Sequence, residues 1–260
     1  MWTREELKMR GKIAFKRNYW SAVLVALVLF LFGGGFANVG ANSVRNQFNQ
    51  NNNTGSYYDE YYYSDNFGND FSYNDGFGVG KILNSTFVVI LSALMGIAAV
   101  FSILLKVFVG NPLIVGGNRF FILNQTEQPS AGTLGYVYKS GNAGNVILTM
   151  FLMDLYVALW SLLFVIPGII KAYEYMMVPY ILAENPGMER SEAFLISKRM
   201  MDGQKWNAFV LDLSFFGWYL LSGITFGILG IFYVNPYVYA TTAELYTWNR
   251  ENAYQKGFIQ

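Results

Sequence analysis

The sequence contains no cysteine and no histidine. These absences exclude disulfides, thiol nucleophiles, metal sites built on His or Cys, Ser-His-Asp triads and imidazole proton shuttles. Charged residues are also scarce, at 13% of the chain, whereas a soluble domain has about a quarter. The formal net charge is +1, so the bulk basic character of a nucleic-acid-binding protein is missing. We therefore expect no catalytic residues, no cofactor, no metal site and no nucleic-acid partner.

Apolar stretches dominate what is present, since 53% of the 260 residues are hydrophobic and 18% are aromatic. A helix needs about 20 apolar residues to cross roughly 30 Å of hydrocarbon. Stretches that reach or approach this length comprise residues 19–39, 82–109, 145–166, 168–183, 207–226 and 227–248. The third and fourth meet at Pro167-Gly168, and the last two meet at 225–227, so each pair predicts a tight hairpin. We predict an all-α, polytopic membrane protein with six transmembrane helices, forming a single membrane domain over residues 1–260.

The distribution of lysine and arginine predicts the orientation of these helices, because cationic loops resist translocation. Basic residues precede the first stretch, at Arg4, Lys8, Arg10, Lys12, Lys16 and Arg17. Acidic residues outnumber basic ones in the loop 38–80, and basic residues recur in the segment 184–206. We therefore place both termini and the connecting segments 110–144 and 184–206 in the cytoplasm. An alternative for the first stretch is a signal peptide, because its apolar core is short and small residues follow it.

The loop at 38–80, on the outer side in this orientation, consists mainly of Asn, Gly, Ser, Tyr and Asp. It has no apolar periodicity and almost no aliphatic residues, so it cannot bury enough surface to order itself. We expect a disordered low-complexity loop. The alternative is an adhesive extracellular surface formed by its tyrosines.

An internal repeat relates the third and fifth stretches. Residues 151–163 and 209–221 both carry the pattern F-x-x-D-L-x-x-x-x-W-x-L-L. The first hairpin resembles them more faintly: its return arm ends at Asn-Pro, residues 111–112, and the last arm contains Asn-Pro at 235–236. Ala26 stands in this first copy where the others have aspartate. Because all copies run in the same direction, we predict three parallel hairpin repeats.

Helical periodicity also marks two cytoplasmic stretches, residues 1–18 and 189–205. In the second, Ala193, Leu195, Ile196 and Met200 can share one face. An amphipathic helix of this kind fits the headgroup region, where anionic lipid favours its basic residues. The alternative is an ordinary helix that packs beneath the membrane helices.

Carboxylates within the apolar stretches are the candidate functional residues. Asp154 and Asp212 occupy equivalent positions of the repeat, near the cytoplasmic ends of their stretches. A charge at the centre of a lone membrane helix costs roughly 2.5 to 3.5 kcal/mol, so both acids should face protein or water. Lys106, Arg119 and Glu244 fall at comparable depth. We predict an inward-facing polar cluster in which Lys106 or Arg119 pairs with one of the aspartates, acting either as a structural lock between helices or as an ion or substrate pathway.

Two further sets of residues complete the candidates. Lys171 and Glu174 are three apart on a helix, and we expect an ion pair nearer the outer side. Pro179 and Pro236 lie inside apolar runs and are expected to kink their helices.

Several blocks of the sequence carry a resemblance to a known family. They are NPLIVGGNRFFIL (111–123), PYILAENP (179–186), SEAFLISKRMMDGQKW (191–206), LDLSFFGWYLLS (211–222) and NPYVYATTAELY (235–246). They resemble a bacterial, mainly Firmicute, integral membrane family catalogued as domain of unknown function 975. That family is distantly similar to the membrane domain attached to some glycerophosphodiester phosphodiesterases. The resemblance implies a multi-pass protein of the bacterial cell membrane and brings no biochemical activity, since this chain has neither the phosphodiesterase catalytic domain nor histidine. Met188 stands where the pattern would have a capping Ser or Asp.

Two classes of function follow from these features. The first is a non-catalytic membrane protein that binds lipid, another membrane protein or an exporter, in envelope upkeep, export or resistance to membrane-active peptides. The second is a small secondary transporter or permease with a path past Asp154 and Asp212. An enzyme is least favoured, because paired carboxylates can do acid/base chemistry but no nucleophile or metal set accompanies them.

Overall fold

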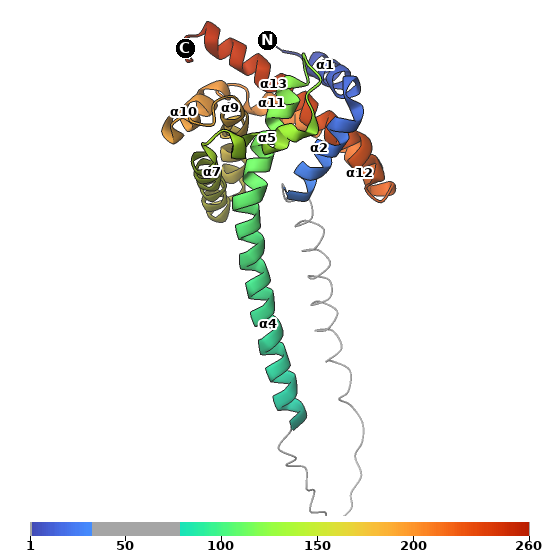
Figure 1. Ribbon diagram of the computed structural model, residues 1–260, viewed down its shortest axis with the longest axis vertical. Helices are drawn as coiled ribbons and strands as arrows, with labels where there is room; N and C mark the ends of the chain where they lie inside the picture. Colours follow the sequence, from blue (N-terminus) through green and yellow to red (C-terminus); the bar gives the residue numbers. More distant parts are fainter. Residues whose placement is uncertain (1, 33–78, 260) are drawn as a thin grey trace, which may run out of the picture. The chain divides into compact units, whose positions relative to one another are not determined.

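The computed structural model describes residues 2–32 and 79–259, and every regular element within these ranges is helical (Figure 1). The loop predicted at 38–80 therefore lies almost entirely outside the described residues.

The chain divides into two compact units, Met1–Phe36 with Leu105–Gln260, and Ala37–Leu104. The described part of the second unit lies in helix α4 (Val79–Leu105). The elements of the first unit are α1 (Arg4–Arg17), α2 (Tyr19–Phe32), η1 (Lys106–Gly110), α5 (Asn111–Leu123), η2 (Ala131–Gly135), α6 (Tyr136–Lys139), α7 (Ala143–Leu163), α8 (Val165–Glu174), α9 (Val178–Glu184), α10 (Arg190–Met200), α11 (Lys205–Leu213), α12 (Phe216–Ile224), η3 (Gly230–Val234) and α13 (Asn235–Gln255).

Helix α1 occupies most of the predicted N-terminal cytoplasmic segment. Thr3 caps it, since its hydroxyl oxygen accepts a hydrogen bond from the Glu6 amide at 3.2 Å. The helix packs along α13, and Gly11 makes this contact possible: a Cβ there would lie 2.6 Å from the Thr241 hydroxyl oxygen. A bend of 107° separates α1 from the apolar helix α2. Thus α1 is held by protein contacts along one side.

Helices α7 and α8 form the predicted hairpin, with its turn slightly earlier than expected. Phe164 adopts an extended conformation (φ −153°, ψ 137°) that ends α7, and Pro167 lies in the first turn of α8, where its missing N–H costs nothing. The two helices touch closely at Gly168, because a Cβ there would lie 2.2 Å from the Ser161 hydroxyl oxygen. The helix break is therefore at Phe164 rather than at Pro167-Gly168.

The last hairpin has more helix breaks than the sequence predicts. The expected helix over 207–226 breaks between α11 and α12, at Ser214 and Phe215. The chain reverses at 225–227, as predicted, and there Phe226 and Gly227 both have positive φ, 51° and 83°. Glycine adopts this region without steric cost. A five-residue π-helical turn, η3, then leads into α13.

Three helical segments are long and apolar enough to cross a membrane. They are Val89–Leu123 (35 residues), Ala143–Leu163 (21 residues) and Lys205–Ile224 (20 residues), and the bent pair α1–α2 makes up to four. The predicted fourth and sixth spans divide into shorter elements: 168–183 covers parts of α8 and α9, and 227–248 covers η3 and part of α13. Six complete spans are thus not among the described helices.

The three prolines of the return arms occupy helix starts. Pro112, Pro179 and Pro236 each stand in the first two positions of α5, α9 and α13. There φ near −65° suits the helix. Pro179 begins a new helix after the turn at 175–177. The backbone before Pro112 and Pro236 instead stays helical and passes through a π-helical turn.

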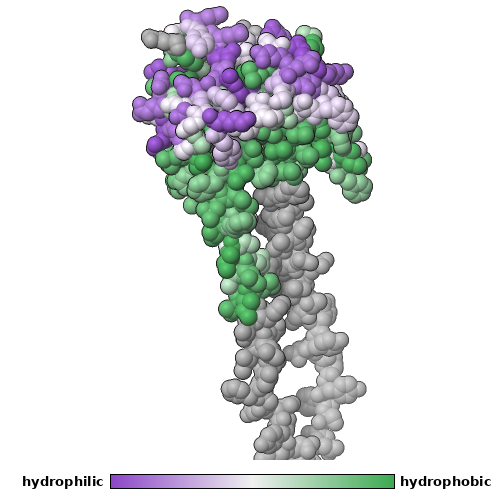
Figure 2. Space-filling model, viewed as in Figure 1, coloured by the Kyte–Doolittle hydropathy of each residue, from purple (hydrophilic) through white to green (hydrophobic). Residues whose placement is uncertain are grey.

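Hydropathy divides the first unit into two layers. Figure 2 shows hydrophilic residues over the end that carries α1, α10 and α13, and hydrophobic residues over the far ends of α7 and α12. The largest fully buried side chains include Phe15, Phe120, Phe121, Phe215 and Tyr246. The core of this unit therefore combines large aromatic side chains with leucines and methionines such as Leu29, Met177 and Leu211.

Candidate functional site

The structure brings Lys106 and Asp154 together. The ammonium of Lys106, in η1, lies 3.0 Å from the Asp154 carboxylate on α7. Both side chains are partly exposed, and they line a cavity of about 400 Å³ that also contacts Met176 and Pro179. The pair thus ties η1 to α7.

Asp212 lies elsewhere, beside a group of tyrosines. The Tyr173 hydroxyl donates a hydrogen bond to its carboxylate at 2.7 Å. Asp212 also lines a cavity of about 440 Å³ that includes Tyr180 and Tyr239. Met176 borders this cavity and the one next to Asp154. Asp154 and Asp212 therefore line separate hollows, both bordered by Met176.

Glu174 is the most completely paired carboxylate in the described part of the chain. Its side chain is 5% exposed and lies 2.9 Å from the Lys171 ammonium and 3.1 Å from that of Lys205, with Lys198 at 4.0 Å. Lys198 and Lys205 belong to the segment 184–206, which the sequence analysis places in the cytoplasm. The expected outer position of the Lys171–Glu174 pair conflicts with this contact, and the pair lies at the level of that segment.

Glu244 and Arg119 do not join the other candidates. Glu244 is buried on α13 and borders a small cavity of about 20 Å³ together with Arg10 and Glu6. Arg119 donates to the Ala183 carbonyl oxygen at 3.4 Å, and its guanidinium lies 5.2 Å from the centre of the Tyr136 ring. The predicted single cluster is therefore distributed over separate places, because Asp154 pairs with Lys106 and Asp212 accepts from Tyr173, each on a different neighbouring element.

A further acid, Glu184, has a role that the sequence analysis did not assign. Its carboxylate accepts a hydrogen bond from the Tyr246 hydroxyl at 2.7 Å and pairs with Arg250. Tyr246 stacks on Tyr180, with ring centres 5.2 Å apart. The sequence shows Glu184 directly after the apolar stretch 168–183, which is a hint that it needs a partner. Its partners on α13 could not be identified, because they are distant in the sequence.

Within residues 2–32 and 79–259, no three acidic side chains are placed to hold a metal ion.

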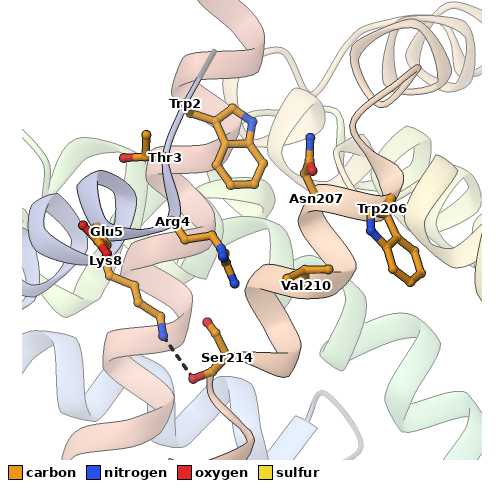
Figure 3. A pocket seen from close by; sticks show the side chains of 9 residues that line it. All are labelled: Trp2, Thr3, Arg4, Glu5, Lys8, Trp206, Asn207, Val210 and Ser214. Atoms are coloured by element: carbon orange, nitrogen blue, oxygen red, sulfur yellow. Dashed lines mark hydrogen bonds between the residues drawn. The ribbon is translucent and has the colours of Figure 1, made fainter.

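The cavity of greatest chemical interest lies between α1 and α11. Its volume is about 780 Å³, and Figure 3 shows Arg4 and Lys8 extending into the space between the two helices, with Thr3 and Glu5 at one edge. Its lining residues are Trp2, Thr3, Arg4, Glu5, Lys8, Trp206, Asn207, Val210 and Ser214. Two cationic side chains and two indoles thus share one hollow with a single carboxylate.

The contacts of these side chains define the chemistry of the cavity. The Lys8 ammonium donates to the Ser214 carbonyl oxygen at 3.0 Å and lies 4.2 Å from the centre of the Phe215 ring. Partial burial lowers the pKa of Lys8, and the charge of Arg4 lowers it further. Arg4 makes no hydrogen bond or ion pair with any of the described residues. Its guanidinium therefore remains available to an anionic ligand.

Comparison with known proteins gives one match. No curated protein and no solved structure matches the chain. Residues 162–252 match the model of a family described as Protein of unknown function (DUF975). The matched range contains Glu174, Asp212 and Glu244, whereas Lys106 and Asp154 lie outside it. The resemblance to the DUF975 family that the sequence motifs carry is thus confirmed over residues 162–252.

Proposed function

We propose that this chain is a non-catalytic integral protein of the bacterial cell membrane that binds anionic phospholipid in the cavity between α1 and α11. The observation that carries the proposal is the unpartnered Arg4 guanidinium beside Lys8 in a hollow of about 780 Å³. Such a protein would serve envelope upkeep, export or resistance to membrane-active peptides, alone or with a membrane partner.

The composition of the cavity supports a lipid headgroup as its ligand. Guanidinium and ammonium groups are the usual protein partners of phosphate. Trp206 is 71% exposed, and tryptophan is enriched at the membrane–water interface, where its ring is apolar and its N–H is polar. Val210 and Ser214 line the same hollow one and two helical turns further along the chain from Trp206. A phosphate between Arg4 and Lys8 would therefore leave the acyl chains next to an apolar helix.

The proposed topology agrees with this site. The basic residues of α1, including Arg4 and Lys8, favour the cytoplasmic side. Both termini are then cytoplasmic, and α1 lies near the leaflet that carries anionic lipid. The site would take its ligand from that leaflet.

Replacing Arg4 by glutamine should weaken binding of phosphatidylglycerol by about tenfold or more, because a hydrogen bond between charged groups in the site contributes about 1.5–3 kcal/mol. Binding is measured with the purified protein and vesicles that contain phosphatidylglycerol or only phosphatidylcholine. Inorganic phosphate serves as a second ligand, since it tests whether the anion alone is sufficient.

Arg10→Gln is the matched control, because it removes the same charge from the same helix. Arg10 is exposed and pairs with Glu6 at 2.7 Å, and it lies outside the lining of the proposed site. Equal losses in the Arg4 and Arg10 variants would show general surface attraction only, and the proposal would fail. It would also fail if the wild-type protein bound both vesicle types equally.

A transporter remains the second candidate, favoured by one observation. Asp154 and Asp212 each line a cavity, of about 400 and 440 Å³, and Met176 borders both. If the Met176 side chain moved, the two cavities would join into one path that passes both carboxylates.

Reconstitution into liposomes tests this candidate with Asp154→Asn and Asp212→Asn combined. For a lipid-binding protein we expect no ion- or proton-coupled uptake in the wild type, and a loss of folding stability in the double variant. Uptake by the wild type, abolished in a variant that keeps its fold, would instead establish transport.

A further inference from the structure

The base of the α7–α8 hairpin is held in the polar layer of the first unit. At its beginning, the Asn145 side-chain amide donates to the carbonyl oxygens of Pro186 and Met188, at 3.0 and 2.8 Å. Both acceptors lie in the segment that is predicted to be cytoplasmic. Asp154, further along α7, is paired with Lys106. Asp154 is the last charged residue before Lys171, so we place the entry of the first arm into the apolar layer at Asp154.

The second arm returns to the same layer after one short helix. Glu174, the last residue of α8, is surrounded by lysines that include Lys198 of α10 and Lys205 of α11. The Ser197 hydroxyl of α10 donates to the Glu174 carbonyl oxygen at 2.8 Å and accepts from the Met177 amide at 3.3 Å. The chain at the end of α8 is thus bound directly to a helix of the polar segment.

The arms of this hairpin are too short to cross the bilayer between those anchors. At about 1.5 Å per residue, α8 with its 10 residues measures roughly 15 Å, and the path from Asp154 to Leu163 measures roughly 14 Å. The hydrocarbon core is about 30 Å thick. The turn at Phe164 would therefore lie about halfway through it.

The last hairpin has the same dimensions. Lys8 of α1 binds the Ser214 carbonyl oxygen just before α12 begins, and Tyr19, at the start of α2, donates to the Phe232 carbonyl oxygen on the return arm at 3.0 Å. Between these anchors, α12 has 9 residues and measures roughly 14 Å. Its turn at Phe226 would also reach only to mid-depth.

Both turns have the surface that a hydrocarbon environment requires. At the first turn, Leu162 is 85% exposed and Phe164 is 71% exposed, and at the second Phe226 is 97% exposed. No charged side chain lies in 160–170 or in 213–234. Turns that emerged into water would hold these large apolar groups in solvent.

Backbone hydrogen bonds at the turns fit this environment as well. Non-helical backbone at membrane depth is tolerated where protein covers it or water reaches it, so the polar groups of a turn that faces lipid must be satisfied within the chain. The Phe164 amide donates to the Trp160 carbonyl oxygen at 3.1 Å, and the Gly227 amide donates to the Ser222 carbonyl oxygen at 2.8 Å. Pro167 has no N–H to satisfy. These turn amides are therefore satisfied without water.

We propose that the α7–α8 and α12–η3 hairpins are re-entrant: both enter from the cytoplasmic side, turn among the acyl chains near the bilayer midplane and return to the same side. They occupy one leaflet only, in place of the four crossings expected over 145–183 and 207–248. Asp154 and Asp212 then stand at the hairpin bases, near the polar layer, where a carboxylate costs little. The inference is independent of the phospholipid proposed for the α1–α11 cavity.

Single cysteines test this proposal without further engineering, because the natural chain has none. Leu162→Cys and Phe226→Cys place a thiol at each turn, and Glu192→Cys on exposed α10 reports the cytoplasmic side. Ser56→Cys, in the loop that is predicted to be outside and lies beyond the described residues, reports the outer side. Each variant is treated with a membrane-impermeant maleimide in intact cells and in inverted membrane vesicles.

Re-entrant turns should react from neither side, whereas each control should react from one. After denaturation in detergent both turn cysteines should react fully, which shows that the variants are present. A nitrobenzoxadiazole group on the same cysteines should be quenched more strongly by lipid spin-labelled deep in the acyl chain than by lipid labelled at the headgroup.

Crossing hairpins would give the opposite pattern. Labelling of the turn cysteines from the outer side, with stronger quenching by headgroup spin labels, would overturn the proposal. If either variant failed to accumulate in the membrane, Ile166→Cys and Ile228→Cys place the thiol in the same turns and decide between the two patterns.

Discussion

Glu174→Gln is expected to destabilise the folded protein by about 2–4 kcal/mol, the largest effect of any single charge removal in the described part of the chain. The carboxylate is 5% exposed, and the ammonium groups of Lys171 and Lys205 lie 2.9 and 3.1 Å away. A neutral amide would leave these two positive charges close together without a counter-charge. The value lies below that of a fully buried pair because both lysines remain partly exposed, at 23% and 30%.

Reversible unfolding of the purified protein in mixed micelles, by titration with sodium dodecyl sulfate, measures this effect. Glu192→Gln is the matched control, since Glu192 is exposed on neighbouring α10 and surface substitutions usually change stability by less than about 0.5 kcal/mol. Lys198→Gln should also have a small effect, because Lys198 is 61% exposed and 4.0 Å from the carboxylate. If Glu174→Gln behaved like Glu192→Gln, the cluster would have no role in holding α8 to α10 and α11.

Gly11→Ala should destabilise the protein by about 1–3 kcal/mol, as overpacking of a tight contact does. The added Cβ would lie 2.6 Å from the Thr241 hydroxyl oxygen and 2.8 Å from the Thr241 Cα. Backbone atoms of α13 cannot rotate away, so α1 must shift along its whole length. The same shift should weaken phosphatidylglycerol binding, because α1 supplies Arg4 and Lys8 to the cavity.

Gly144→Ala is the control for this substitution. A Cβ at Gly144 meets nothing within 4 Å, and alanine is the better helix former by up to about 1 kcal/mol. We therefore expect unchanged or slightly higher stability and unchanged lipid binding. Thermal unfolding in detergent and the vesicle assay are run on both variants. A stable Gly11→Ala protein with normal lipid affinity would show that the close α1–α13 contact is not needed for the cavity.

These substitutions and the cysteine labelling address different parts of the molecule. Glu174 tests how the polar layer is held together, Gly11 tests how α1 is seated on α13, and the turn cysteines test how deep the hairpins reach. A re-entrant arrangement would insert apolar volume into one leaflet, with the anionic-lipid cavity at the base of the last hairpin. The protein would then respond to the composition and packing of that leaflet.

Several local features were predictable from the sequence because they depend on residues close together in the chain. The reversal at 225–227 follows from a glycine that can adopt positive φ. A hairpin over α7 and α8 was predictable from Pro167-Gly168 between two apolar runs, although the break itself is at Phe164. The contact between Lys106 and Asp154 was one of the pairings predicted, because the two residues lie at similar depth in their apolar stretches.

Other features needed partners that are distant in the sequence. The depth of Asp212 along its helix predicted a cationic partner, but the group that donates a hydrogen bond to its carboxylate is the Tyr173 hydroxyl. The Lys171–Glu174 pair reads as an isolated helical pair until Lys205 is brought beside it. Arg250 and Tyr246 converge on Glu184 only because α13 packs near α9. In each case the choice of partner is made by helix packing.

The sequence by itself determined that this chain is helical and apolar, that its acids stand at the ends of apolar arms, and that residues 162–252 match the DUF975 family model. Composition and local periodicity are sufficient for those statements, since each depends on residues within one helix or turn. Only the tertiary structure decided where the polar layer ends, because Lys8, Ser197 and Lys205 bind the hairpin bases from other helices. An apolar run shows that a segment prefers hydrocarbon, whereas its anchors determine how far the segment can reach into it.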